Sequence, residues 1–414
     1  MKKKVLIIGH SAKEEALAKI LSERFEVYVS PGNDSIKNFA TCVDIREQNV
    51  IEILNFALEN DIELTIASSE DAIRANIAEL FNDNGLMIFA PNSDSAQFTL
   101  SRSIAKKLFY KLRLPTPRFA VYEKKNLAID YLKKCEMPVV IKTDNKNNKN
   151  SVMVCPSDVI AKSYIEDCFF SNESKVIIEE YIYGTPFSFY VVTDGYKALP
   201  LGSTKNYKFS LEGDGGLWTE GMGACSPFTQ LTYDHEDYIM NEIVYPVINY
   251  LSEGLKPYLG IICFEGVLTP EGDIAITECS PFLADYDADG ILALLNEDIY
   301  NIFYSCVTGA FSDDYDLLDF KEDYTVSCVL SSGQFKGDVI SGLDDLEENI
   351  LISHINTKQN EYTEFETTGG RTLVVTATGK TLNRASERLY DEINAIDFKG
   401  KTYRKDICRI PVHI

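Results

Sequence analysis

The sequence predicts a multidomain protein of mixed α/β and α+β class, with a parallel-sheet domain at its N-terminus. The chain has 414 residues, of which 45% are hydrophobic and 25% charged. At about 150 residues per domain, it has room for two or three domains. Strand-like and helix-like patterns alternate over residues 5–89 and change character after Leu114, and a further α+β pattern begins near Asp313. These observations together predict three successive units.

The N-terminal unit is predicted from short apolar runs that alternate with segments whose apolar residues recur every three or four positions. This βαβαβ order is typical of a parallel sheet with helices on both faces. Ligands of such sheets bind beyond the carboxyl ends of the strands, so the loops that follow the strands should share one rim. The predicted strands are Val5–Ile8, Glu26–Val29, Leu64–Ala67 and Leu86–Phe89, the helices Glu14–Leu21, Val50–Leu58 and Ala72–Leu80, and the loops Gly9–Ala12, Ser30–Asp34 and Ser68–Asp71.

The middle of the chain is predicted to hold a small strand-rich unit and then a larger one. Pro115 and Pro117 disfavour helix and mark a boundary near Leu114. Beyond it, apolar runs predict short strands, the first two joined by the polar stretch DNKNNKN. The predicted strands are Pro138–Thr143, Ser151–Val154, Val176–Glu180, Phe187–Thr193, Gly260–Leu268 and Asp273–Glu278, with helices at Asp158–Phe169 and Tyr238–Gly254.

The C-terminal unit is predicted from two long apolar strands and one helix. The runs DYTVSCVLSS and GGRTLVVTATG are rich in residues that favour strands, and a turn follows the first run at Gly333. The segment Thr381–Ile396 spaces its apolar residues as a helix does. An α+β unit from about Asp313 onward follows.

The charge balance disfavours nucleic acids and membranes as partners. Lys and Arg number 40 against 63 Asp and Glu, which gives a net charge of −23, and such a surface repels phosphate backbones and anionic lipids. No window approaches the roughly 18 apolar residues of a membrane span. The start MKKKVLIIGHS has an apolar run of only four residues, so it predicts a strand and not a signal peptide, which needs about 7–15. We therefore expect a cytoplasmic protein.

Cysteine and histidine usage predicts neither a disulfide framework nor a zinc site. The ten cysteines form no CxxC pair and lie mostly in apolar strand-like runs, and the four histidines are scattered. Reduced, mostly buried thiols are the expected state.

Three features suggest nucleotide chemistry, and each also has an ordinary structural explanation. Lys142 ends the strand PVVIKTD and could reach a phosphate, but a lysine at a strand end is usually just solvated. The strand VIIEEYIYG could hydrogen-bond an adenine edge, as an ordinary edge strand could. Glu265 and Glu278 lie on successive strands around the turn PEGD. They could bridge Mg²⁺, although acids beside a hairpin as often face solvent.

The order of these features and several longer motifs resembles the phosphoribosylamine–glycine ligase family of ATP-grasp enzymes, from Val5 to Ile407. This resemblance implies an N-terminal Rossmann-like domain over residues 1–100, an ATP-grasp unit over 101–312 with a lid subdomain over 118–188, and a C-terminal α+β domain over 313–414. The motifs are EGMGACSP at 220–227, GGRTLVVTATGKTL at 369–382, YRKDI at 403–407, SPGND at 30–34, LPTPRF at 114–119, VVIKTD at 139–144, EEYIYG at 179–184, ALPLGSTKNYK at 198–208 and ITEC at 276–279.

The resemblance implies a ligase reaction on small-molecule substrates. ATP would phosphorylate the glycine carboxylate, and the amine of 5-phosphoribosylamine would attack the acyl phosphate, giving glycinamide ribonucleotide, ADP and phosphate. A carboxylate oxygen becomes a good leaving group only once it is phosphorylated. ATP and Mg²⁺, or Mn²⁺, would be the cofactors, since charge on the transferred phosphoryl group must be offset by cations.

The resemblance also assigns site residues. Lys142 and Asp214 would be catalytic, with Lys142 on the ATP phosphates and Asp214 near the glycine or phosphoribosyl end. Arg102 stands where the family has a lysine that reaches ATP. Glu278 and Ser280 occupy the family's metal positions, and Glu265 adds a second acid where the family usually has glycine. The predicted ATP-binding set is Arg102, Lys142, Glu179, Glu180 and Ile182, and the predicted metal set is Glu265, Glu278 and Ser280.

Departures from the family pattern fall on the loops that would face ligands. The phosphate-covering loop, Gly-Leu-Ala-Ala-Gly-Lys-Gly in the family, is here residues 145–151, NKNNKNS, without glycine. Phe282 stands where the family has an arginine that pairs with the substrate carboxylate, and no nearby arginine in the sequence replaces it. We therefore expect weak glycine turnover. Three hypotheses remain: a working phosphoribosylamine–glycine ligase, an ATP-grasp ligase for another carboxylate and amine, or a catalytically silent relative that binds or regulates.

Overall fold

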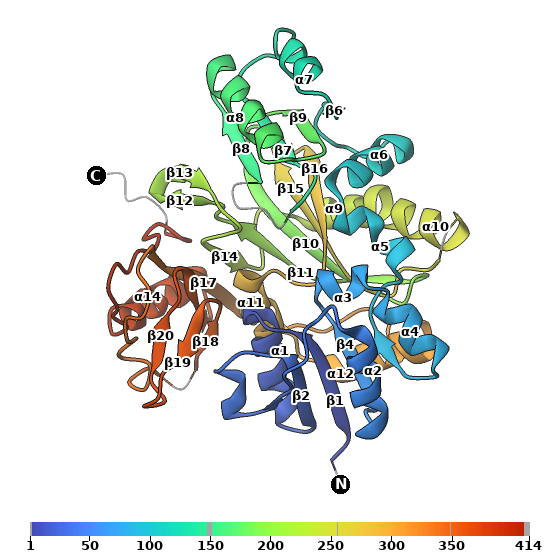
Figure 1. The fold of residues 1–414 in the computed structure, drawn as a ribbon, viewed down its shortest axis with the longest axis vertical. Helices are drawn as coiled ribbons and strands as arrows, with labels where there is room; N and C mark the ends of the chain where they lie inside the picture. Colours follow the sequence, from blue (N-terminus) through green and yellow to red (C-terminus); the bar gives the residue numbers. More distant parts are fainter. Residues whose placement is uncertain (1, 147–150, 255, 348, 410–414) are drawn as a thin grey trace.

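The computed structural model describes residues 2–146, 151–254, 256–347 and 349–409. In Figure 1 the N-terminal sheet lies at the bottom, a small lid at the top, and a long sheet runs between them toward the C-terminal strands on the left. The middle of the DNKNNKN stretch, residues 147–150, lies outside the described residues.

The N-terminal sheet is parallel, as predicted, with strand order β3-β2-β1-β4-β5. Alternate residues of β1 face two cores: Val5 and Ile7 pack with α1, while Leu6 and Ile8 pack with α2 and α4. This alternation is the period of a strand buried on both faces. The strands are β1 (Lys4–Gly9), β2 (Glu26–Pro31), β3 (Thr41–Cys42), β4 (Leu64–Ala67) and β5 (Ile88–Phe89), and the helices are α1 (Ala12–Ser22), η1 (Ile36–Asn38), α2 (Val50–Glu59), α3 (Glu70–Arg74) and α4 (Ile77–Asp83).

Two features of this domain differ from the prediction. The single helix expected over Ala72–Leu80 is two helices, α3 and α4, because Asn76 takes a left-handed conformation with φ of 63°. Asparagine tolerates this conformation better than most residues. The two-residue strand β3 was missed, since so short a segment has no readable periodicity.

The lid is a four-stranded antiparallel sheet of order β6-β9-β7-β8, covered by α7 and α8. Two helices, α5 and α6, lead into it from the first domain (Figure 1). The side chains of Val139, Ile141 and Ile178 form its core with Ala161 and Ile165 of α8. The elements are α5 (Ser93–Leu100), α6 (Arg102–Leu112), β6 (Phe119–Tyr122), α7 (Lys125–Leu132), β7 (Val139–Thr143), β8 (Val152–Cys155), α8 (Asp158–Phe170) and β9 (Val176–Glu180).

An eight-stranded sheet of order β16-β15-β10-β11-β14-β17-β21-β18 forms the centre of the molecule. The strand predicted at Phe187–Thr193 is β10, which pairs with β15 and β11 and not with the lid strands. The C-terminal strands continue the same sheet, because β17 pairs with β14. The strands are β10 (Thr185–Thr193), β11 (Ala198–Asn206), β14 (Gly223–Ser226), β15 (Gly260–Leu268), β16 (Ile274–Pro281), β17 (Tyr324–Gly333), β18 (Ile350–His354) and β21 (Gly370–Gly379).

Helices cover this sheet on both faces. Phe189 and Val191 of β10 pack with α9 and α10, whereas Tyr190 and Val192 pack with α11 and α12. The predicted helix at Thr381–Ile396 is the shorter α14, whose N-cap Thr381 accepts a hydrogen bond from the Arg384 N–H. The remaining elements are β12 (Phe209–Leu211), η2 (Glu212–Asp214), β13 (Gly215–Trp218), α9 (Tyr233–Ile239), the π-helical η3 (Met240–Val244), α10 (Tyr245–Gly254), α11 (Asp285–Leu294), α12 (Ile299–Thr308), α13 (Phe311–Asp314), β19 (Thr357–Gln359), β20 (Phe365–Thr367) and α14 (Leu382–Ile393).

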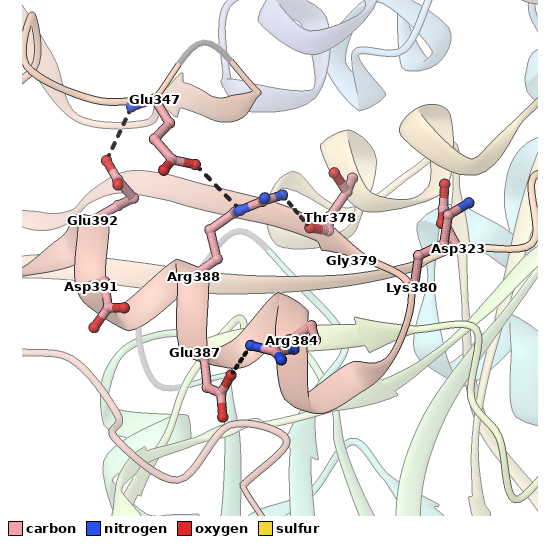
Figure 2. Close-up of a pocket in the computed structure, with 10 residues that line it drawn as sticks. All are labelled: Asp323, Glu347, Thr378, Gly379, Lys380, Arg384, Glu387, Arg388, Asp391 and Glu392. Carbon is pink, nitrogen blue, oxygen red and sulfur yellow. Dashed lines mark hydrogen bonds and ion pairs between the residues drawn. The ribbon is translucent and has the colours of Figure 1, made fainter.

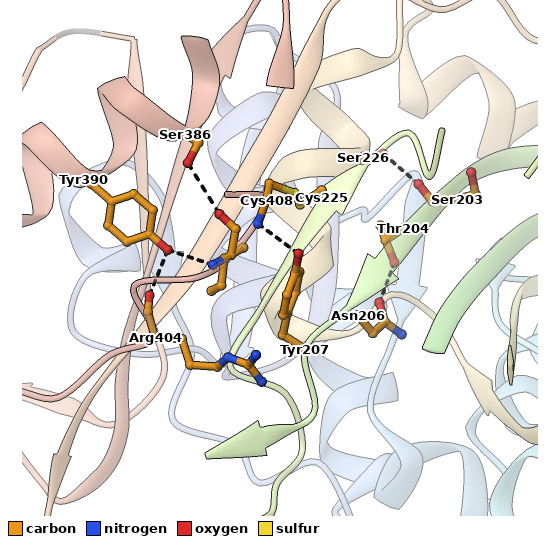
Figure 3. The surroundings of a disulfide bond; sticks show 11 residues. Ser203, Thr204, Asn206, Tyr207, Cys225, Ser226, Ser386, Tyr390, Arg404 and Cys408 are labelled. Atoms are coloured by element: carbon orange, nitrogen blue, oxygen red, sulfur yellow. Dashed lines mark hydrogen bonds between the residues drawn. A yellow bond between two sulfur atoms is a disulfide. The ribbon is translucent and has the colours of Figure 1, made fainter. Parts of the chain in front are cut away.

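Two cysteines depart from the expectation of reduced thiols. Cys225 on β14 and Cys408 in the C-terminal segment form a disulfide, with Cα atoms 6.4 Å apart (Figure 3). The other eight cysteines are free, and six of these are buried. Spacing could not reveal the pair because 183 positions separate its members, and only the fold brings β14 against the C-terminal segment.

The lengths and compositions of the helices show whether any of them could span a membrane. Within the described residues, none is both long and apolar enough to cross a bilayer.

Candidate active site

A cleft of about 850 Å³ opens between the lid, the strands β15 and β16, and the loops of the first domain. The β12–β13 hairpin and Arg371 of β21 also line it. The cleft brings together every predicted site residue, from six separate stretches of chain. These are Arg102, Lys142, Glu179, Glu180, Ile182, Asp214, Glu265, Glu278 and Ser280.

Lys142 is held by the lid strands on which it was predicted. It lies on β7 and its side chain is 6% exposed. Its Nζ is 3.1 Å from Glu179 Oε2 and donates to the Thr277 carbonyl at 3.2 Å. Glu179 on the neighbouring β9 also pairs with Lys106 of α6, at 3.2 Å. The Glu179 carboxylate is therefore a buried counter-ion for two lysines, a different environment from the adenine contact expected of it.

Glu278 on β16 is surrounded by three cations. Its Oε1 lies 2.8 Å from Arg102 Nε and 3.5 Å from Lys146 Nζ, and its Oε2 lies 3.9 Å from Lys142 Nζ. Burial alone would raise the pKa of this carboxyl, but the three cations outweigh burial and hold the pKa well below its usual range. Arg102 also donates to the Thr143 carbonyl at 3.0 Å, which fixes its guanidinium between the lid and β16.

Four basic side chains thus surround two carboxylates, and we call this group the cation cluster. Burial lowers the pKa of Lys106 to about 8, although Glu179 acts in the opposite direction, so this lysine still carries charge at neutral pH. A buried excess of positive charge in a cleft attracts an anion, and a polyphosphate supplies several negative charges at once. The cluster is Arg102, Lys106, Lys142 and Lys146 around Glu179 and Glu278.

The second predicted metal acid, Glu265, faces Glu278 but is already paired. The two residues are direct cross-strand partners on β15 and β16. Lys208, whose side chain is 8% exposed, places its Nζ 2.9 Å from Glu265 Oε2. Burial lowers the pKa of Lys208, but Glu265 and Tyr286 outweigh that effect and raise it well above the ordinary value.

These pairings bear directly on whether the residues fit a Mg²⁺ ion. A divalent cation needs free oxygen ligands, yet ammonium or guanidinium groups contact all three predicted ligands, with the Ser280 hydroxyl 3.5 Å from Lys146 Nζ. No group of three or more His, Cys, Asp or Glu side chains that could hold a metal occurs in the described part of the chain. The predicted carboxylate bridge does not fit this arrangement.

A second basic pair lies in the same cleft, at residues the sequence did not single out. Lys13 of α1 and Arg371 of β21 lie 4.0 Å and 3.9 Å from the carboxylate of Asp285. Burial lowers the pKa of Lys13, but Glu14 and Asp285 outweigh it and raise that pKa above the ordinary value. The signal for Arg371 was present in the motif GGRTLVV, but nothing in the sequence showed that it returns to the cleft.

The expectation of weak glycine turnover, drawn from Phe282, stays a prediction. No arginine near it in sequence replaces the family's carboxylate-pairing arginine, but the fold brings Arg371 into the same cleft. The Phe282 ring is only 4% exposed and packs in the core near Phe303, 6.4 Å between ring centroids. Phe282 has a φ of 66°.

The remaining predicted residues border the cleft. Asp214 lies in η2, the turn between β12 and β13, and its carboxylate is 2.8 Å from the buried Arg404 guanidinium. Glu180 accepts hydrogen bonds from the Arg118 main-chain N–H at 2.8 Å and from its Nε at 3.0 Å. Ile182 follows β9 at the lid edge of the cleft.

A second hollow, of about 680 Å³, lies on the C-terminal domain beside α14 (Figure 2). Its lining has three basic and five acidic side chains, and the basic groups are paired, Lys380 with Asp323 at 2.7 Å and Arg388 with Glu347 at 3.3 Å. It has no excess of positive charge comparable to that of the cation cluster, so the cleft under the lid is the candidate active site.

Comparison with known proteins shows the family of the chain. The chain matches the phosphoribosylglycinamide synthetase N domain over residues 3–99, its ATP-grasp (A) domain over 100–288 and its C domain over 331–409. A phosphoribosylamine–glycine ligase of Halalkalibacterium halodurans is 32% identical, with 97% of this chain and 96% of the relative covered. One of Clostridium acetobutylicum is 31% identical, with 98% and 99% covered.

Solved structures share the fold. The crystal structure of phosphoribosylamine–glycine ligase from Thermotoga maritima superposes with a TM-score of 0.83 at 24% identity, covering 98% of this chain and all of that one. The biotin carboxylase domain of the Hydrogenobacter thermophilus 2-oxoglutarate carboxylase gives 0.75 at 14% identity, with 97% and 91% covered. From the match over nearly its whole length, the chain belongs to the ATP-grasp family of phosphoribosylamine–glycine ligases.

Proposed function

We propose that this protein is an ADP-forming carboxylate–amine ligase, with glycine and 5-phosphoribosylamine as its substrates. The observation that carries the proposal is the cation cluster, which collects an excess of positive charge at the centre of the cleft. Relatives about 30% identical over the full chain are named phosphoribosylamine–glycine ligases, which supports the choice of substrates. We also propose the domain limits 1–100, 101–312 and 313–414, with the lid over 118–188.

In the first step a carboxylate oxygen of glycine attacks the γ-phosphorus of ATP, and the bond to the β-phosphate oxygen breaks to release ADP. Arg102, Lys142 and Lys146 would contact the phosphates and offset the charge that develops on the transferred group. The aliphatic parts of Arg102 and Lys142 are fixed by α6 and the lid strand β7, so these two side chains need little reorganisation when the nucleotide binds. Glu180 and Ile182 would line the adenine at the end of β9.

In the second step the amine nitrogen of 5-phosphoribosylamine attacks the acyl carbon. The acyl C–O bond breaks, inorganic phosphate leaves with one former carboxylate oxygen, and the nitrogen loses a proton. Lys13 and Arg371 suit the anionic groups of the substrates, because both are basic and border the cleft beside Asp285. A guanidinium makes two parallel bonds to a carboxylate or phosphate. Asp214, on the hairpin side, would contact the amine substrate.

ATP-grasp ligases use ATP together with a divalent metal. Cations of the chain engage the predicted ligands here, so a metal held by Glu265 and Glu278 takes no part in the two proposed steps. The cytoplasm, where ATP is abundant, remains the location we propose.

Position 282 favours a second candidate, a ligase for another carboxylate. A phenylalanine there removes one guanidinium from the cleft wall, so a carboxylate other than glycine could be the better substrate. The experiment is steady-state ADP release with ATP and Mg²⁺, using glycine and a panel of other amino acids, with and without 5-phosphoribosylamine.

The outcome separates the hypotheses. ADP release that requires both glycine and 5-phosphoribosylamine supports the first proposal, and release with a different carboxylate supports the second. If no pair of substrates causes ADP release, the third hypothesis, a catalytically silent relative that binds or regulates, is supported.

A further inference from the structure

Lys146 has an unusual environment for a lysine. It lies in the segment that follows β7, yet its side chain is only 8% exposed. Its Nζ donates to the main-chain carbonyls of Thr99 at 2.7 Å and of Cys279. The Ser280 hydroxyl and Glu278 Oε1 both lie 3.5 Å away. Two carbonyls, one hydroxyl and one carboxylate therefore surround a single positive charge.

This is the kind of oxygen shell that hard divalent cations take in proteins. Glu278 and Ser280 are also two of the three residues predicted to hold the metal, so the ammonium is found where that ion was expected. A second cation, Arg102, contacts the same carboxylate oxygen at 2.8 Å. A divalent ion at this position would meet two fixed positive charges and one carboxylate, and repulsion would oppose its binding.

We propose that the Lys146 ammonium replaces a protein-bound divalent cation beside Glu278, so that the chain neutralises the phosphates of an adenine nucleotide with its own side chains. The inference rests on the proposed function, since it assumes that the cation cluster holds a nucleotide. It concerns only the ion beside Glu278.

Lys208, which lies between β11 and β12, places its Nζ 2.9 Å from Glu265 Oε2. Both acids predicted to bridge a metal therefore have an internal cation.

The test measures ADP binding with excess EDTA and with excess Mg²⁺. Trp218, the only tryptophan, lines the cleft and supplies a fluorescence signal, with calorimetry as a second readout. We expect the dissociation constant of the wild type to differ by less than about threefold between the two conditions. In Lys146→Met, the affinity for ADP in EDTA should fall by about 10- to 100-fold, since a charge-assisted contact is lost. Excess Mg²⁺ should then raise the affinity of this variant for ADP by at least about tenfold.

Two further variants make the result specific. Lys146→Arg keeps the charge and should still bind ADP in EDTA, which separates charge from loop folding. Lys162→Met removes an exposed lysine of the lid helix α8 and should match the wild type. Wild-type binding that depends strongly on Mg²⁺, and that Lys146→Met leaves unchanged, would overturn the inference alone. A wild type that binds no ADP in either condition would overturn the nucleotide site itself.

Discussion

At the scale of single residues, the chemistry of the cleft depends on buried lysines that share carboxylates. Lys142 and Lys106 share Glu179, and Lys142 also approaches Glu278. Sharing has a consequence for mutations. When one lysine is removed, the carboxylate keeps a partner, so the protein avoids an isolated buried charge and the loss falls mainly on the bound anion.

Lys142→Met tests this reasoning. We expect ADP to bind about 10- to 100-fold more weakly, because one charge-assisted contact of about 1.5–3 kcal/mol is lost. The free energy of unfolding should fall by only about 1–3 kcal/mol, since Glu179 retains Lys106. Fluorescence titration with ADP and urea unfolding measure the two effects. Unchanged ADP affinity in a folded variant would remove Lys142 from the nucleotide site.

Residues of the site differ in how far the sequence could predict them. Lys142, Glu278 and Asp214 all line the cleft, and each sits in a short motif whose own strand or turn positions it, while their roles stay predictions. Arg371 and Lys13 were missed, since their approach to Asp285 joins three separate parts of the chain. The ion pairs of Lys146 and Lys208 were also invisible, because a spacing pattern shows where acids lie but not which cations reach them.

At the scale of elements, the contact between helix α1 and strand β18 joins the N-terminal domain to the C-terminal strands. Glu15 of α1 is fully buried. It accepts a hydrogen bond from the His354 main-chain N–H at 2.8 Å and from Ser35 at 2.8 Å, and it pairs with Lys19 at 2.9 Å. Burial raises the pKa of this carboxyl, but His354 and Lys19 outweigh burial and lower the pKa to about 2.

The sign of the pH dependence follows from that shift. The folded-state pKa lies below the value of about 4.3 in an unfolded chain, so the stabilisation by Glu15 is fully present above about pH 5 and is lost as the pH falls toward 2. Glu15→Gln should lower the free energy of unfolding at pH 7 by about 2–4 kcal/mol. The difference between variant and wild type should shrink as the pH is lowered from 5 to 3. Urea unfolding across this range measures it, and a difference that does not change with pH would contradict the assignment.

Elements also show where prediction from sequence ends. The alternation of Val5 to Ile8 between two cores made β1 and its neighbours readable. The break between α3 and α4 could not be predicted in this way. The apolar spacing continues in phase across both helices, and only the left-handed backbone conformation of Asn76 interrupts the helix. The continuity of the large sheet through β14 and β17 depends on pairing between distant strands, which spacing within one strand cannot show.

At the scale of the whole molecule, the C-terminal segment reaches back to the cleft through Arg404. This guanidinium is 2% exposed, pairs with Asp214 at 2.8 Å and with Asp406 at 2.6 Å, and donates to the Phe209 carbonyl at 3.2 Å. It therefore fixes the turn between β12 and β13, the hairpin that carries Trp218 at the cleft.

Arg404→Lys should loosen that hairpin, since a lysine cannot bond both acids and the carbonyl with a planar fork. We expect the KM for the amine substrate to rise by about tenfold, while ADP affinity changes by less than about threefold. Steady-state kinetics and the emission of Trp218 report on the two ends of the cleft. An equal loss of ADP affinity would indicate a general structural role for Arg404 instead.

The activity proposed for the whole molecule is tested most directly by following one oxygen atom. Glycine labelled with ¹⁸O in its carboxylate is incubated with the protein, ATP, Mg²⁺ and 5-phosphoribosylamine, and the inorganic phosphate is analysed by mass spectrometry. An acyl-phosphate route transfers one labelled oxygen to each phosphate released, and omission of the amine should suppress phosphate release. Unlabelled phosphate, or no phosphate beyond that of a protein-free control, would contradict the assignment of this cleft as a glycine-activating ligase site.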